Sequence, residues 1–232
     1  MGRDPIYTQT ICDEAGIDVK HATGFYKEPF LPDIVYRSDE NALSDFLMRE
    51  ILIGIRDSGI RANHIGEIGT GNNKISEIEE KIFMAAARAH VNTGVPICTH
   101  CTLGTMGHQQ IDLLRRHGVE LTKVVLSHLD LTDDFDYIVS VLDTGVNIAF
   151  DTIGKNNYRP DETRVDWLVD LCARGYDSQV LLSMDITRKS CCTKPGYLYL
   201  LTDFLPRLRE RGLSDSCLEN IMWNNSHRIY LN

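Results

Sequence analysis

The chain has 232 residues, of which 43% are hydrophobic and 25% are charged, and these values are ordinary for a globular protein. Its formal net charge of −9 argues against general binding to nucleic acids or to anionic membranes. No apolar run approaches the roughly 20 residues that a membrane-spanning helix needs, and the N-terminal stretch MGRDPIYTQT lacks the apolar core of a signal peptide. We therefore expect a cytoplasmic protein without nucleic-acid or membrane partners.

Apolar patterns along the chain alternate between short β-rich runs and longer amphipathic stretches. Strands are expected at 18–23, 62–68, 95–100, 123–128, 146–151 and 180–185, and helices at 39–58, 76–93, 107–118, 132–144 and 161–176. Ser76 followed by Glu79 is typical of a capping box at a helix start. Strict alternation of strand and helix predicts a parallel sheet, either open or closed into a (β/α) barrel. Since no linker or low-complexity run divides the chain, we interpret residues 1–232 as a single domain.

The seven cysteines have no regular spacing, so we expect reduced thiols rather than a disulfide framework. Cys98 and Cys101 form a CxxC, but no second CxxC completes a zinc knuckle.

Polar side chains stand where several predicted strands end. Glu67 and His100 are 33 residues apart, His100 and His128 are 28 apart, and His128 and Asp185 are 57 apart. These intervals match one, one and two βα units of about 30 residues, which would place the side chains on the same rim of a barrel. Taken singly, each is more often a hydrogen-bonding or capping residue. Together, imidazoles and carboxylates in this phase predict a site for zinc or a similar divalent ion.

Several literal strings carry a family resemblance when read in this order. They are GEIGT at 66–70, TGVPICTHCT, VVLSHLDLTDD, FDTIGKN and LLSMDITRKS. Over essentially the whole chain, the sequence resembles the phosphotriesterase family of the amidohydrolase superfamily, and within it the branch of phosphotriesterase homology proteins. The resemblance implies a TIM-type (β/α)8 barrel with a metal centre that hydrolyses ester bonds.

The resemblance also implies roles for individual residues. His100 and His128 match the metal-binding histidines of the family's fifth and sixth strands, and Glu67 occupies the position that bridges two metals. Asp185 matches the eighth-strand aspartate, which binds metal and shuttles a proton. The substrate would be a lactone, a carboxylate ester or a phosphoester. Lys155 and Arg188 follow strands seven and eight, and we expect them to bind an anionic group, as in a phosphorylated sugar lactone; ordinary solvated charges are the alternative.

One element of the family pattern is missing from the sequence. No two of the eight histidines are two residues apart, so the first-strand HxH motif is absent, and the chain corresponds to about six strands, numbers three to eight of the barrel. A single ion, best matched by Zn²⁺, is therefore expected rather than two. Exposed barrel edges would favour a homo-oligomer. The sequence is read either as a fragment of a longer hydrolase or as a chain that assembles with a partner.

Two different readings remain open from the sequence. The chain could be a catalytically silent binding or assembly protein, or an open α/β sheet in which the histidines never converge.

Overall fold

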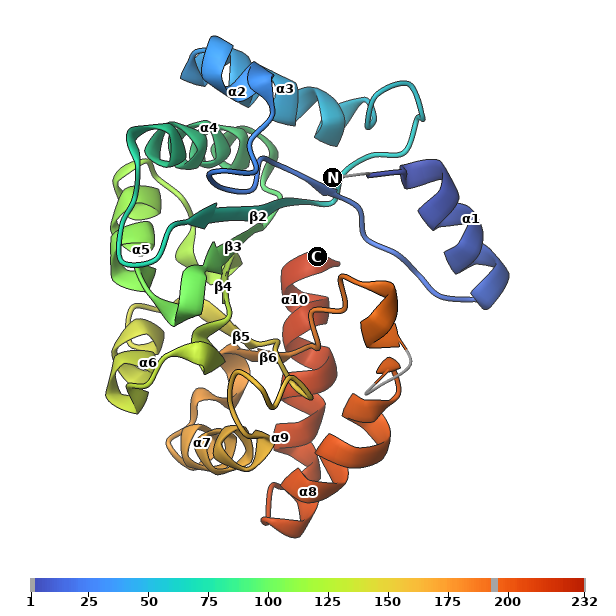
Figure 1. The fold of residues 1–232 in the computed structure, drawn as a ribbon, viewed down its shortest axis with the longest axis vertical. Coiled ribbons are helices and arrows are strands. Elements are labelled where there is room, and N and C mark those ends of the chain that lie inside the picture. Colours follow the sequence, from blue (N-terminus) through green and yellow to red (C-terminus); the bar gives the residue numbers. More distant parts are fainter. Residues whose placement is uncertain (1–2, 193–195, 232) are drawn as a thin grey trace. The chain divides into compact units, whose positions relative to one another are not determined.

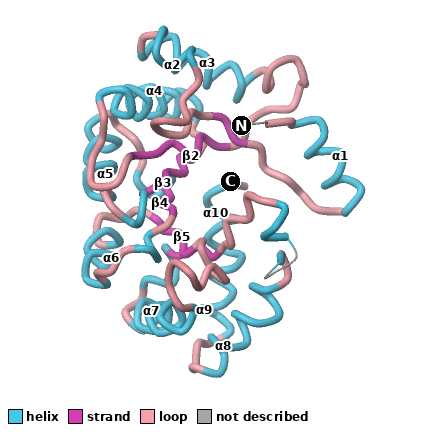
Figure 2. The backbone as a smooth tube through the Cα atoms, in the orientation of Figure 1, coloured by secondary structure: helices cyan, strands magenta, loops and turns pink. Residues whose placement is uncertain are grey.

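A computed structural model describes residues 3–192 and 196–231. The strands in this part of the chain are β1 (Ala22–Thr23), β2 (His64–Thr70), β3 (Ile97–Cys101), β4 (Val124–Ser127), β5 (Asn147–Phe150) and β6 (Val180–Leu182). They form one six-stranded sheet whose strand order follows the chain order (Figures 1 and 2), and β1–β2, β4–β5 and β5–β6 are parallel pairs. The predicted α/β fold with a parallel sheet is confirmed.

Helices occupy the connections between the strands, and others precede β1 or follow β6 (Figure 1). They are α1 (Pro5–Ala15), α2 (Asp33–Arg37), α3 (Glu40–Leu52), α4 (Glu77–Thr93), α5 (Gly107–Arg116), α6 (Phe135–Leu142), α7 (Asp161–Ala173), α8 (Leu205–Glu210), α9 (Asp215–Glu219) and α10 (Asn225–Tyr230). Helix α3 ends well before its predicted end at residue 58, because the chain turns through positive φ angles at Gly54 and Arg56. Helix α1 was not predicted: it buries only Pro5, so its sequence carries no core-facing stripe.

The ends of α4 follow the capping signals in the sequence. The Ser76 hydroxyl accepts a hydrogen bond from the Glu79 N–H at 3.3 Å, and the Glu79 carboxylate accepts one from the Ser76 N–H at 3.0 Å, which completes the predicted capping box. The same carboxylate accepts the Gly71 N–H at 3.3 Å. The capping box therefore also holds the segment that follows β2. At the other end, Gly94 closes the helix with φ 75°.

The core lies along the middle strands of the sheet. Every residue of β4 and β5 is buried, which is typical of parallel strands covered on both faces. Such strands place only the residues at their ends within reach of solvent, and His128 directly follows the end of β4. No helix among the described residues combines the length and apolar character needed to cross a bilayer.

Contacts between Cα atoms divide the chain into two compact units. The first unit comprises the chain up to His100 together with His108–Val124, and the second comprises Cys101–Gly107 and the chain from Val125 onward. The first contains β1, β2 and α1–α4, and the second contains β5, β6 and α6–α10. The interpretation of the chain as a single domain stays a prediction.

Candidate functional site

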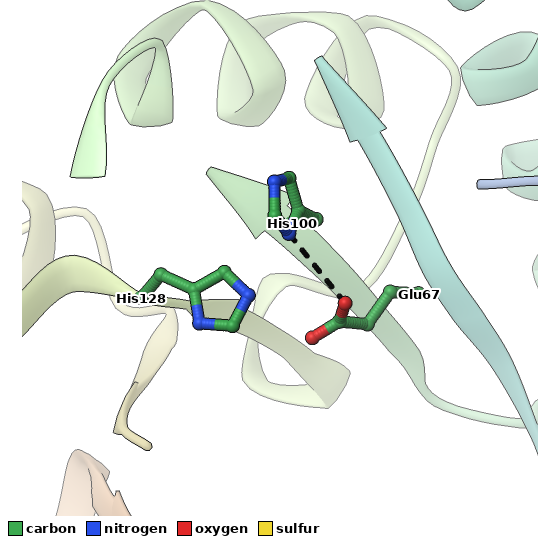
Figure 3. A group of neighbouring side chains, drawn as sticks. All are labelled: Glu67, His100 and His128. Atoms are coloured by element: carbon green, nitrogen blue, oxygen red, sulfur yellow. Dashed lines mark ion pairs between the residues drawn. The ribbon is translucent and has the colours of Figure 1, made fainter. Parts of the chain in front are cut away.

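Within the first unit, a carboxylate and an imidazole come from neighbouring stretches of the sheet. Glu67 lies on β2 and His100 on β3, and His100 Nδ1 is 3.6 Å from Glu67 Oε2 (Figure 3). The side chain of His100 is 13% exposed and that of Glu67 is 31% exposed. Both therefore remain within reach of a ligand from solvent.

Two glycines of β2 explain why the sequence around Glu67 reads GEIG. A Cβ atom at Gly66 would collide with the backbone carbonyl of Cys98, and Gly66 also has φ 142°, which disfavours any side chain. A Cβ atom at Gly69 would lie only 2.9 Å from the Cβ of His100. The two glycines thus allow β2 to approach the segment that carries His100 closely enough to seat its imidazole.

Tyr26 adds a hydroxyl group beside His100. Its oxygen is 3.0 Å from His100 Nδ1 and 3.2 Å from Nε2, and the two rings meet edge to face with centroids 4.8 Å apart. A hydroxyl group in this position can donate to an unprotonated ring nitrogen or accept from a protonated one. The sequence analysis did not single out Tyr26, although it follows the first strand as the other polar residues follow theirs.

In the second unit, His128 is held by a carboxylate from the next strand. Its Nδ1 lies 2.8 Å from Asp151 Oδ1, and its backbone N–H donates to the same oxygen at 3.0 Å. Both residues are buried. In the neutral ring, an Nδ1–H donated to a carboxylate leaves Nε2 unprotonated, as in many metal-binding histidines. His128 itself directly follows β4 with φ 66°, a conformation that is uncommon outside glycine.

Glu67, His100 and His128 form a group of side chains that could hold a metal ion. Each offers one ligand atom, and these atoms all lie within 4.8 Å of one another (Figure 3). Four ligands about 2.1 Å from a tetrahedral ion are roughly 3.4 Å apart, so the most distant pair of these donors would have to approach by about 1 Å to surround one ion. Two imidazoles and a carboxylate are also the donor types that zinc and similar ions prefer. The residues therefore fit a divalent metal.

The remaining predicted residues lie elsewhere in the second unit. Asp185 follows β6 and is not a member of this three-residue group. Its carboxylate pairs with the ammonium group of Lys155, which also donates to the backbone oxygen of Asp185 at 2.7 Å. Arg188 is exposed. The metal-binding and proton-transfer roles of Asp185 and the anion-binding roles of Lys155 and Arg188 stay predictions.

Comparison with known proteins places these observations in context. The sequence profile of the phosphotriesterase family matches residues 1–230. Phosphotriesterase homology protein from Escherichia coli is 42% identical over 99% of this chain and 80% of its own length. N-acetyltaurine hydrolase from Dictyostelium discoideum is 29% identical over 99% of this chain and 66% of its own length.

Solved structures give the same picture for the fold. The E. coli protein, crystallised with phosphate in its active site, superposes with a TM-score of 0.96 over 99% of this chain and 80% of that one. A lactonase from Listeria monocytogenes, 27% identical, superposes with a TM-score of 0.93 over 99% of this chain and 78% of its own. The parallel sheet is therefore that of phosphotriesterase-type TIM barrels.

Proposed function

Since this chain belongs to the phosphotriesterase family, we propose that it is a metal-dependent hydrolase that acts on ester bonds of small molecules. The observation that carries the proposal is the convergence of Glu67, His100 and His128. A carboxylate and two imidazoles within reach of one ion are what a hydrolytic metal site requires, and they stand at positions that the sequence pattern singles out.

The known relatives support a hydrolytic reaction and leave the substrate broad. Their names refer to a lactone, to an N-acetyl amide and, in the family name, to phosphotriesters. In all three classes, water attacks an electrophilic carbonyl carbon or phosphorus atom. For this chain we propose a lactone, a carboxylate ester or a phosphoester as the substrate. Because Lys155 and Arg188 are basic, a phosphorylated sugar lactone is one candidate within this range.

The metal is assigned to the three converging residues. Glu67, His100 and His128 would hold one ion, with Zn²⁺ the best match to the donor set. When bound, a divalent ion would lower the pKa of water and polarise the carbonyl or phosphoryl oxygen of the substrate.

The protein's own groups prepare this site. Asp151 holds the proton of His128 on Nδ1 and thereby directs Nε2 to the ligand position. The rings of Tyr26 and His100 pack edge to face, which limits the rotation of the imidazole. We assign to Asp185 the uptake of a proton from the attacking water and its return to the leaving group. The ammonium group of Lys155 donates to both the carboxylate and the backbone oxygen of Asp185, so this carboxylate has a defined position.

The test combines metal binding with hydrolysis. Chelator-treated protein is dialysed against Zn²⁺, Co²⁺ or Mn²⁺, the bound ions are counted, and the loaded protein is assayed with a lactone, an aryl ester, a phosphotriester and an N-acetyl amide. We expect one ion per chain and turnover of at least one substrate. His128→Ala should lose the ion, whereas His227→Ala, at an exposed histidine, should keep it.

Each other outcome contradicts part of the proposal. Failure of the wild-type protein to bind any ion would reject the metal site. An ion without turnover on any substrate would favour the silent binding protein, and two ions per chain would reject the single-ion assignment.

A further inference from the structure

A buried arginine joins the two loops that carry His128 and its carboxylate partner. Arg164, on α7, has no exposed surface. Its Nε donates to Asp130 Oδ2 at 2.7 Å, its Nη2 to the Thr152 hydroxyl at 2.6 Å, and its Nη1 to Asp161 Oδ1 at 2.8 Å. All three faces of the guanidinium group are thus engaged with protein.

The partners of Arg164 stand beside the site residues in the sequence. Asp130 lies two residues after His128, in the loop that follows β4, and Thr152 comes directly after Asp151, in the loop that follows β5. These two loops are also joined directly, since the Thr152 hydroxyl donates to Asp130. The His128–Asp151 hydrogen bond spans the same pair of loops. The guanidinium contacts and the imidazole contact therefore join the same two loops. We call the region where these two loops meet the junction.

The junction contains a buried carboxylate and a residue with a positive φ angle. Asp130 Oδ1 has no hydrogen-bond partner in the part of the chain that the structure describes, so this fully buried carboxylate depends on what its Oδ2 atom receives. His128 has φ 66°, which a non-glycine residue keeps only when its surroundings hold it there. Without Arg164, the loop after β4 would carry an unneutralised buried charge next to a strained residue.

The third contact connects the junction to a further loop. Asp161 Oδ1 accepts from Arg164, and the same carboxylate accepts the Gly154 N–H at 3.1 Å and the Tyr199 hydroxyl at 2.8 Å. Gly154 precedes Lys155, one of the residues proposed to contact substrate. The guanidinium group thus also fixes the start of the segment that carries Lys155.

We propose that Arg164 is a positioning residue that sets the orientation of the His128 imidazole by joining the loops after β4 and β5. The expected effect on metal affinity rests on the proposed function. The orientation of the imidazole, by contrast, is a property of the metal-free protein. A lysine cannot replace the arginine, because one ammonium group cannot reach three partners that the planar guanidinium group contacts at once.

The test uses Arg164→Lys, with Val165→Ala as the matched control. Val165 is also fully buried on α7, so its truncation destabilises the same helix without removing a hydrogen bond to the loops. The first readout is the long-range ¹H–¹⁵N spectrum of the histidines in metal-free protein. Wild-type and Val165→Ala should show His128 in a single tautomer with the proton on Nδ1. Arg164→Lys should show exchange between tautomers.

The second readout is affinity for Zn²⁺ or Co²⁺ alone, with folding checked by circular dichroism. Arg164→Lys should weaken binding about tenfold or more, the usual effect of losing an outer partner of a metal ligand, while Val165→Ala stays within about threefold of wild type. If Arg164→Lys does not fold, Thr152→Val, which removes one link of the junction and keeps the side-chain shape, takes its place in both measurements.

The outcomes separate this inference from the proposed function. An unchanged His128 spectrum in the variant, or an equal change in Val165→Ala, would overturn the positioning role. If wild-type protein binds no metal, the proposed function fails, and the His128 spectrum alone decides the role of Arg164.

Discussion

The hydrogen bond between His128 and Asp151 allows a quantitative prediction. In Asp151→Asn, the side-chain oxygen can still accept from His128 Nδ1 and from the His128 backbone N–H, so the shape of the site is kept and only the charge is lost. A buried hydrogen bond to a charged group contributes about 1.5–3 kcal/mol and a neutral one about 1 kcal/mol. We therefore expect the free energy of unfolding to fall by about 1–2 kcal/mol.

The effect on metal binding follows from the loss of charge. The carboxylate makes the imidazole a better electron donor and holds its proton on Nδ1. An amide holds the proton there less well and hardly increases the electron donation of the ring. Affinity for Zn²⁺ should fall about 10–100-fold, which is about 1.4–2.7 kcal/mol. Competition with a chromophoric chelator measures the affinity, and urea denaturation measures the stability.

A matched substitution controls for the loss of a negative charge. Asp143 accepts a hydrogen bond from the Tyr176 hydroxyl at the surface, and Asp143→Asn should leave the metal affinity within about twofold of wild type. If Asp151→Asn loses stability as expected but binds Zn²⁺ like the wild-type protein, then His128 is not a ligand oriented by Asp151, and the reasoning is refuted.

Three further predictions concern pH, thiols and the glycines of β2. Burial lowers the pKa of His64 from 6.5 to about 4, so on acidification this histidine is protonated in the unfolded chain before it is protonated in the folded protein. The free energy of unfolding should therefore fall by about 2 kcal/mol between pH 7 and 4.5. His64→Gln should flatten this part of the stability profile in urea titrations. Burial raises the pKa of the Cys172 thiol to about 12, whereas Cys192 is exposed. A maleimide at pH 7.5 should therefore label Cys192 before Cys172, as followed by peptide mass mapping, and faster labelling of Cys172 would contradict the packing. Gly69→Ala should cost about 1–3 kcal/mol and weaken metal binding together, because the new methyl group meets the His100 side chain; a loss of stability with unchanged Zn²⁺ affinity would place His100 outside the site.

Much of the architecture follows from local patterns in the sequence. The alternation of buried β-rich runs and amphipathic stretches predicts the strands and five of the helices, because these patterns record which side chains face a core. The phase of Glu67, His100 and His128 follows from the same alternation, since each βα unit returns the chain to the same edge of a parallel sheet. Ser76 and Glu79 mark a helix start by contacts within four residues, which a sequence displays directly.

Only the tertiary structure decided which groups the polar side chains contact. Asp151 could equally have capped a helix, and its contact with His128 depends on how two loops 23 residues apart come together. Lys155 reads as an anion-binding residue from its position, yet in the fold its ammonium group meets Asp185. Arg164 has an ordinary place in an amphipathic helix, and only the packing of that helix reveals that it joins two loops. Periodicity specifies which face of an element is buried, whereas the pairing of groups distant in sequence depends on distances of a few ångströms that no local pattern encodes.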